Sequence, residues 1–179
     1  MYPIKGCQGF STFEAKLTSR GLLHDREFMV VKESTGRFVS QRNFPKMCLV
    51  KACICDENIN LIITNTNTNS KQKPIKIPLN TTGIVKEVTV WGSKCSAYDC
   101  GDEVAAWFTE ALPIDESPSA DNDDNDNDNY NENGNVSLRL VRMLPNQLFM
   151  RHTGIGSSSN NSNVSTDTGT GEVSFADQY

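Results

Sequence analysis

The sequence lacks several features that would assign it to a common class of protein. No apolar run approaches the ~20 residues that a membrane-spanning helix needs, and no charged n-region followed by an apolar h-region opens the chain. We therefore expect a soluble chain without a membrane segment or a recognisable targeting signal. The Gly-rich phosphate loop, the HExxH zinc motif and the GxSxG nucleophile motif are also missing.

Positive charge is sparse, and the acidic residues are concentrated in one stretch. Lys and Arg do not cluster with aromatic residues, so no nucleic-acid partner is expected. Residues 115–135 carry six Asp, two Glu and no Lys or Arg, which gives this stretch a formal charge of −8. The whole chain carries a formal charge of −5. The rest of the chain therefore carries +3 (−5 + 8) and is mildly basic.

The six cysteines do not form a recognisable disulfide or zinc pattern. Cys53 and Cys55 are two apart on one strand, Cys95 and Cys100 are five apart, and neither pair is a CxxC motif. The two histidines, His24 and His152, are far from them in sequence. We expect reduced, half-buried thiols in an intracellular protein, without a structural metal.

Short apolar segments separated by turn residues predict a β-rich domain. Residues 28–31 form a continuous apolar run, typical of a strand buried on both faces, and residues 37–41 follow as its hairpin partner. We expect an α+β fold, mainly antiparallel β, forming a barrel or a rolled sheet. The other expected strands are residues 2–10, 12–18, 47–55, 59–64, 75–79, 85–91, 94–98, 136–144 and 148–151.

One amphipathic helix is predicted over about residues 101–112. Asp99 is available as its N-terminal cap, and Pro113 marks its end. Its apolar residues recur at i, i+3, i+4, i+7 and i+8: Val104, Trp107, Phe108, Ala111 and Leu112.

The chain divides into one β-rich domain and three further segments. The domain is expected to comprise residues 1–112 and 136–151. Residues 113–135 are an acidic Asn/Asp-rich insert and residues 152–171 a polar linker, neither with enough apolar surface to order. Residues 172–179 begin a strand pattern that stops at once, so the chain is expected to be truncated.

Lys5 and Arg26 are the main candidate site residues. Lys5 precedes Gly6 on a turn, and Arg26 precedes the apolar run at 28–31. If the two segments are neighbouring strands, both cations converge on one anion, with backbone N–H groups near Gly6 as further donors. The alternative is a solvated Lys5 and an Arg26 that pairs with Asp25 or Glu27.

Three weaker candidates each have an ordinary structural explanation. Gln41-Arg42 is either a second anion contact or a self-solvating loop. Cys100 is either a reactive thiol with a pKa lowered by the helix N-terminus or a small packing residue. His24 is beside Asp25, but no nucleophile pattern accompanies it.

Six motifs, in order, resemble the N-terminal β-barrel domain of MOSC proteins. That group includes mitochondrial amidoxime-reducing components, bacterial relatives with a ferredoxin domain, and the C-terminal part of molybdenum cofactor sulfurases. The motifs are Tyr2-Pro3-Ile4-Lys5, Gly21-Leu22-x-x-Asp25-Arg26, Met29-Val30-Val31, Ser40-Gln41-Arg42-x-x-Pro45, Trp91-Gly92 and Asp99-Cys100-Gly101-Asp102.

The resemblance implies a molybdenum cofactor (molybdopterin) held partly by this domain. In the amidoxime-reducing relatives, the lysine of the first motif, the residue after it and the arginine of the second motif contact the cofactor. The implied cofactor-binding residues here are therefore Lys5, Gly6 and Arg26, with the cofactor's phosphate and pterin as their partners. Relatives often carry serine at position 6, so Gly6 keeps only its backbone N–H.

The resemblance also implies what the complete protein does. The first hypothesis is an oxidoreductase that reduces N-hydroxylated substrates with a cytochrome b5-like or ferredoxin-like electron-transfer partner, in the cytoplasm or the mitochondrion. The second is a molybdenum cofactor sulfurase whose separate domain carries pyridoxal phosphate, and the third is a non-catalytic recognition barrel. Residues 172–179 resemble the start of the MOSC core, which holds the family's molybdenum-ligating cysteine. None of the six cysteines corresponds to that ligand, so this chain alone is not expected to be catalytic.

Overall fold

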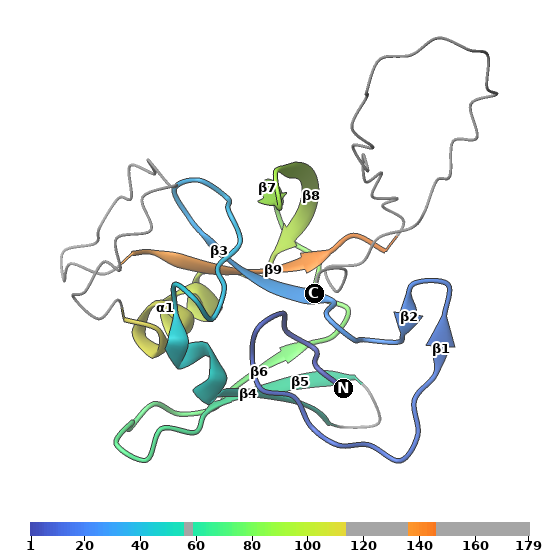
Figure 1. The fold of residues 1–179 in the computed structure, drawn as a ribbon, viewed down its shortest axis with the longest axis horizontal. Coiled ribbons are helices and arrows are strands. Elements are labelled where there is room, and N and C mark those ends of the chain that lie inside the picture. The colour runs from blue at the N-terminus through green and yellow to red at the C-terminus, as the bar shows by residue number, and fades with distance from the viewer. Residues whose placement is uncertain (56–58, 114–135, 146–179) are drawn as a thin grey trace, which may run out of the picture.

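A computed structural model describes residues 1–55, 59–113 and 136–145 of the chain (Figure 1). The sequence predictions for the acidic insert beyond Pro113, the strand at 148–151, the linker at 152–171 and the strand at 172–179 lie outside these residues.

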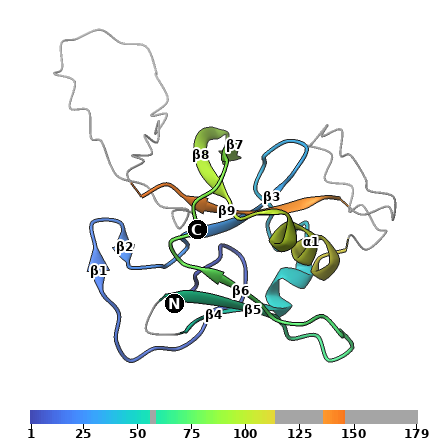
Figure 2. The same ribbon diagram turned by 180° about the vertical axis from the view of Figure 1, so that it is seen from behind.

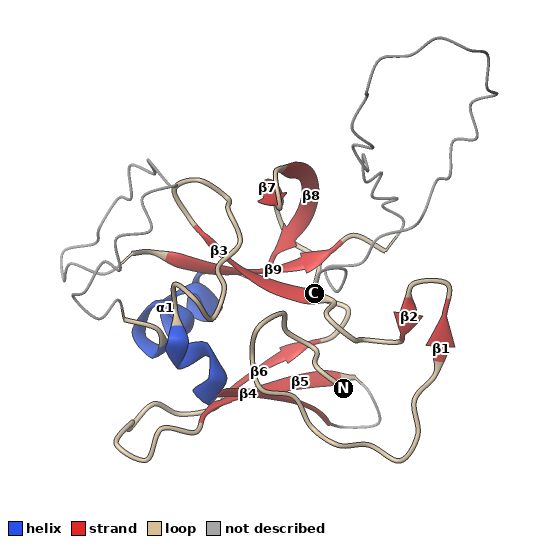
Figure 3. Ribbon diagram, in the orientation of Figure 1, coloured by secondary structure: helices blue, strands red, loops and turns tan. Residues whose placement is uncertain are grey.

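Most described elements are short β-strands, accompanied by one α-helix (Figure 3). The elements are β1 (Leu17–Thr18), β2 (Gly21–Leu22), β3 (Phe28–Lys32), the 3-10 helix η1 (Pro45–Leu49), β4 (Val50–Cys55), β5 (Asn60–Asn65), β6 (Ile75–Pro78), β7 (Val85–Val90), β8 (Ser93–Asp99), α1 (Asp102–Ala111) and β9 (Leu138–Met143).

The strands form two main sheets and a hairpin, and every pairing between them is antiparallel. One sheet has the order β3-β9-β8-β7 and the other β4-β5-β6, while β1 pairs only with β2. This arrangement confirms the α+β, mainly antiparallel β fold class.

Residues 36–39 join the two edges of the four-stranded sheet. On one side, the Val39 N–H donates to the Val30 carbonyl of β3 over 3.0 Å. On the other, the Phe38 N–H donates to the Thr89 carbonyl of β7 over 3.1 Å. The rolled sheet encloses a small apolar cluster: Met29, Val31, Val88, Cys95, Ala97, Val141 and Met143, with Phe38 and Val90 packed against it.

The larger core lies between the two sheets and is covered at one end by α1 (Figures 1 and 2). The N-terminal segment links the sheets, because Lys5 N donates to the Phe28 carbonyl at 2.8 Å and Gln8 N to the Val50 carbonyl at 2.8 Å. The backbone around residues 4–8 is thus held by β3 on one side and β4 on the other.

Strand β3 and helix α1 confirm the two strongest sequence predictions. Phe28 and Val30 face the larger core and Met29 and Val31 face the smaller cluster, so β3 is buried on both faces. The helical stripe is likewise buried in the larger core: Val104, Trp107, Phe108, Ala111 and Leu112.

Three sequence predictions about local structure are wrong. The strand expected over 12–18 is reduced to Leu17–Thr18, and the alternating Phe13 and Leu17 are exposed instead of facing a core. The strand expected from residue 47 begins at Val50, because Pro45 starts a 3-10 helix in front of it. Asp99 does not cap α1, whose N-cap is Gly101 without a side-chain hydrogen bond.

The expected strands at 2–10 and 37–41 are present only as isolated bridges. Ile4 pairs with Phe28 and Gln8 with Lys51, while Phe38 bridges Val31 in the antiparallel sense that the hairpin prediction requires.

Candidate functional site

The segments that carry Lys5 and Arg26 lie side by side. Arg26 N donates to the Tyr2 carbonyl at 2.7 Å, and Ile4 forms a parallel bridge with Phe28. Ile4 and Phe28 are both fully buried. These core contacts fix the backbone from which the two cationic side chains project.

Arg26 stands on a left-handed backbone, with φ of 48°. Its guanidinium forms an ion pair with Asp25 and lies over the Tyr2 ring, 5.3 Å from the ring centroid. Asp25 also accepts a 2.7 Å hydrogen bond from the Tyr2 N–H. The alternative predicted from sequence, an Arg26–Asp25 pair, is therefore present.

Lys5 is half-buried and lies against two aromatic rings. Its Nζ is 5.5 Å from the Phe38 centroid and 5.7 Å from the Trp91 centroid. Burial, and then the positive charge of Arg26, lower the pKa of the Lys5 ammonium. The charge of Arg26 therefore acts on Lys5, and Lys5 is not the fully solvated lysine of the alternative.

Gly6 contributes its backbone to this turn. Its φ of 78° is in the region that favours glycine, and an added Cβ would lie 3.0 Å from the Met47 Cε. Its carbonyl accepts a 2.7 Å hydrogen bond from Gln41 Nε2. Gln41 therefore fastens the turn, while Arg42 of the same motif is exposed.

A largely buried acidic side chain, that of Glu27, holds the loop that precedes β3. Glu27 Oε1 accepts a 2.8 Å hydrogen bond from Arg142 Nε, and its Oε2 is 2.7 Å from His24 Nδ1. Burial opposes ionisation of Glu27, but the hydrogen bond from His24 and the charge and hydrogen bond of Arg142 outweigh it and lower its pKa. His24 therefore supports the loop next to Arg26.

The family model described as MOSC N-terminal beta barrel domain matches residues 1–115. The chain belongs to this family. It is 36% identical over 116 residues to mitochondrial amidoxime reducing component 2 of Rattus norvegicus, covering 63% of this chain and 33% of that protein. It is 33% identical over 113 residues to molybdenum cofactor sulfurase of Danio rerio, covering 63% of this chain and 14% of that protein.

The chain thus spans a third or less of these two relatives. A solution structure of a Bordetella bronchiseptica protein superimposes with a TM-score of 0.45 at 14% identity, covering 75% of this chain and 92% of that one.

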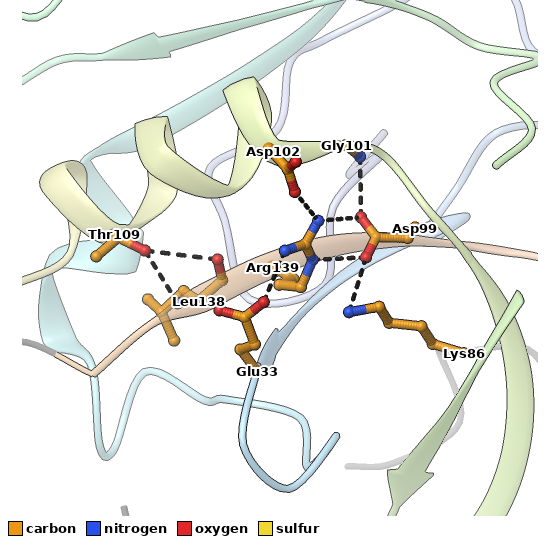
Figure 4. A network of polar contacts seen from close by, with 8 residues as sticks. All are labelled: Glu33, Lys86, Asp99, Gly101, Asp102, Thr109, Leu138 and Arg139. Atoms are coloured by element: carbon orange, nitrogen blue, oxygen red, sulfur yellow. Dashed lines mark hydrogen bonds and ion pairs between the residues drawn. The ribbon is translucent and has the colours of Figure 1, made fainter. Parts of the chain in front are cut away.

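An ion network centred on Arg139 connects β8, β9 and the start of α1 (Figure 4). Arg139 Nε lies 2.5 Å from Asp99 Oδ2, and its other nitrogens bind Glu33 at 2.7 Å and Asp102 at 2.6 Å. Lys86 adds a contact to Asp99 at 3.1 Å. Burial disfavours the Asp99 carboxylate, but hydrogen bonds from Arg139, the Gly101 N–H and Lys86 lower its pKa overall. Asp99 is therefore a structural anchor between β8, β9 and the start of α1.

The six cysteines are free thiols that differ in exposure: Cys7 and Cys95 are buried, Cys48 is exposed, and Cys53, Cys55 and Cys100 are partly buried. Burial, together with the nearby Asp99 charge, raises the pKa of Cys100 to about 12, and burial raises that of Cys7 to about 12. This favours the packing alternative for Cys100. Within residues 1–55, 59–113 and 136–145, no three His, Cys, Asp or Glu residues gather as a metal site would need. No helix in this part of the chain is long and apolar enough to cross a membrane.

Three residues near Lys5 and Glu27 were not among the site residues expected from the sequence. Phe38 and Trp91 come from separate elements and meet at a ring distance of 4.6 Å beside Lys5. Arg142 lies on β9, far in sequence from the Glu27 that it holds. The sequence shows Trp91 in a Trp-Gly turn and Arg142 in a strand with two arginines. Neither pattern indicates which distant residue the side chain contacts.

Proposed function

We propose that this chain binds the anionic part of a molybdenum cofactor, with Lys5 and Arg26 as the phosphate-binding side chains and Gly6 as a backbone N–H donor. The observation that supports the proposal is the backbone pairing of the segments that carry Lys5 and Arg26, in a chain with relatives named for the molybdenum cofactor.

The residues present fit a phosphate group. Arg26 pairs with Asp25, while the carboxylate of Glu27 is engaged by Arg142 and His24. The site is half-buried, and electrostatic attraction is stronger there than in bulk water. A bound phosphate would also relieve the repulsion between Lys5 and Arg26. The cofactor would supply the metal-centred chemistry, and this part of the chain would orient it.

For the complete protein, the first candidate is an oxidoreductase that reduces N-hydroxylated substrates with an electron-transfer partner. The 36% identity to the amidoxime reducing component supports it. The second candidate is a sulfurase-type protein, supported by the 33% identity to the Danio rerio sulfurase. Nothing in the relatives supports pyridoxal phosphate, and we do not propose it.

We expect Lys5→Gln and Arg26→Gln each to weaken cofactor retention about 10-fold, because each variant loses one hydrogen bond to a charged group. The chain would be incubated anaerobically with molybdopterin released from a donor enzyme, and the retained pterin measured by fluorescence after oxidation. Arg42→Gln, which removes an exposed arginine of the neighbouring loop, is the matched control and should retain cofactor normally.

If the unmodified chain retains no pterin, or if Arg42→Gln loses as much as Lys5→Gln, the proposal fails. In the complete protein, undiminished cofactor retention by the Lys5→Ala, Arg26→Ala double variant would favour a non-catalytic recognition barrel.

The lowered pKa of Lys5 predicts a pH dependence for anion binding. An anion favours the charged ammonium, so affinity should fall as pH rises through the lowered pKa of Lys5, at a lower pH than the ordinary lysine value of 10.5 implies. Titrations with inorganic phosphate at increasing pH would measure this decline. The Lys5→Arg variant stays charged across the range and should show a flatter profile; identical profiles would contradict the prediction.

A further inference from the structure

The turn between β7 and β8 places a bulky residue in an unfavourable conformation. Val90 pairs with Ser93, which leaves Trp91 and Gly92 as a two-residue turn. Both have positive φ, 51° and 82°, as a type I′ turn requires. Asn is the preferred first residue of such a turn because it tolerates the left-handed region, and Trp does not.

The strain at Trp91 coincides with the candidate site. Among the described residues, only His24, Arg26 and Trp91 combine a side chain with a positive φ. Arg26 is a proposed phosphate ligand, and the Trp91 ring lies 5.7 Å from the Lys5 Nζ. Residues other than glycine that adopt a left-handed backbone cluster at ligand sites. There the function requires a particular side-chain position, and this requirement outweighs the conformational cost.

The surroundings of Trp91 suit contact with a flat ligand. Trp91 is 51% exposed although it is among the largest apolar side chains. The Phe38 ring supports it at 4.6 Å and 54°, and the other cation, Arg26, has the half-exposed Tyr2 ring beside it. The described part of the chain therefore presents two cations next to exposed aromatic surface.

We propose that Trp91 is a ring platform: the planar ring of a phosphorylated heteroaromatic ligand stacks on it while Lys5 and Arg26 hold the phosphate. The inference rests on the proposed function and names Trp91 as a residue that selects a pterin phosphate over a bare anion. Aromatic side chains stack on heteroaromatic bases in the same way in single-stranded nucleic-acid sites.

The test uses Trp91→Asn, which removes the ring and installs the residue that this turn favours. The 179-residue chain is titrated with inorganic phosphate and with 6-hydroxymethylpterin monophosphate, and binding is followed by NMR. We expect Trp91→Asn to weaken binding of the pterin phosphate about 10-fold, a typical stacking contribution, and to leave inorganic phosphate binding unchanged. Trp91→Phe, which keeps a ring, should recover most of the loss.

The outcomes separate the two proposals. If Lys5→Gln weakens both probes while Trp91→Asn weakens neither, the platform is overturned and the phosphate site stands. Equal weakening of both probes by Trp91→Asn would mean that Trp91 acts only through Lys5, which also overturns the platform. If the unmodified chain binds neither probe, both proposals are overturned. If Trp91→Asn unfolds at a temperature no lower than that of the parent chain, misfolding is excluded as the cause of weaker binding.

Discussion

Arg139→Met is expected to lower the free energy of unfolding by about 3–5 kcal/mol, the usual cost of removing one partner from a buried ion pair. The Arg139 side chain is 11% exposed and that of Asp99 5% exposed. Without the guanidinium, Asp99 keeps only Lys86 and the Gly101 N–H as partners. The loss would be measured by urea denaturation at neutral pH, where Asp99 is ionised.

The exposed pair between Lys94 and Glu87 is the matched control. Its nitrogen–oxygen distance of 2.7 Å equals that of the Arg139–Glu33 contact, but its side chains are 70% and 64% exposed. Since water solvates both partners, Lys94→Met should change stability little. Similar losses in the two variants would show that burial does not determine the strength of the Arg139 network.

The local sequence pattern predicts those elements of the fold that pair or pack with residues nearby in the sequence. The β4–β5 and β7–β8 hairpins and helix α1 each follow from periodicity and a nearby turn. Strand β9 was also expected as a strand, but its central position between β3 and β8 depends on partners far away in sequence. The family match ends at residue 115, although β9 completes the sheet.

Two of the wrong predictions have a cause that the local pattern does not contain, whereas the third, at Pro45, is a local effect of the proline. The alternation at Phe13 and Leu17 has no core to face, so it does not form a long strand. Asp99 was expected to cap the helix from its position in the sequence, but its carboxylate is bound by Arg139, which lies forty residues later in the chain. A local rule fails when a distant charged partner competes for the same oxygen atoms.

The candidate site shows the same division. The sequence raised the pairing of the segments that carry Lys5 and Arg26 as a condition for the site, and their backbones do lie side by side. The aromatic surroundings were not predictable, because Phe38 and Trp91 meet only when residues 36–39 join β3 to β7. The closure of the sheet therefore creates the environment that lowers the pKa of Lys5.

Arg142→Met is expected to affect both stability and the candidate site. Arg142 Nη2 lies 2.7 Å from Glu27 Oε1, its Nη1 donates to the Thr81 carbonyl at 3.1 Å, and both side chains are largely buried. Removing the guanidinium leaves Glu27 with His24 alone and should cost about 3 kcal/mol in urea denaturation. Because Glu27 follows Arg26 directly, the loosened loop should also weaken phosphopterin binding about 10-fold, one hydrogen bond to a charged group.

Arg139→Met separates the two effects, because it destabilises the same strand through partners that do not include Glu27. At a temperature where both variants remain folded, Arg139→Met should bind phosphopterin like the parent chain and Arg142→Met should not. Glu27→Gln, which retains the shape and a hydrogen-bonding oxygen but loses the charge, should fall between the parent and Arg142→Met. Equal binding by the two arginine variants would mean that the Glu27–Arg142 pair supports the fold and does not position Arg26.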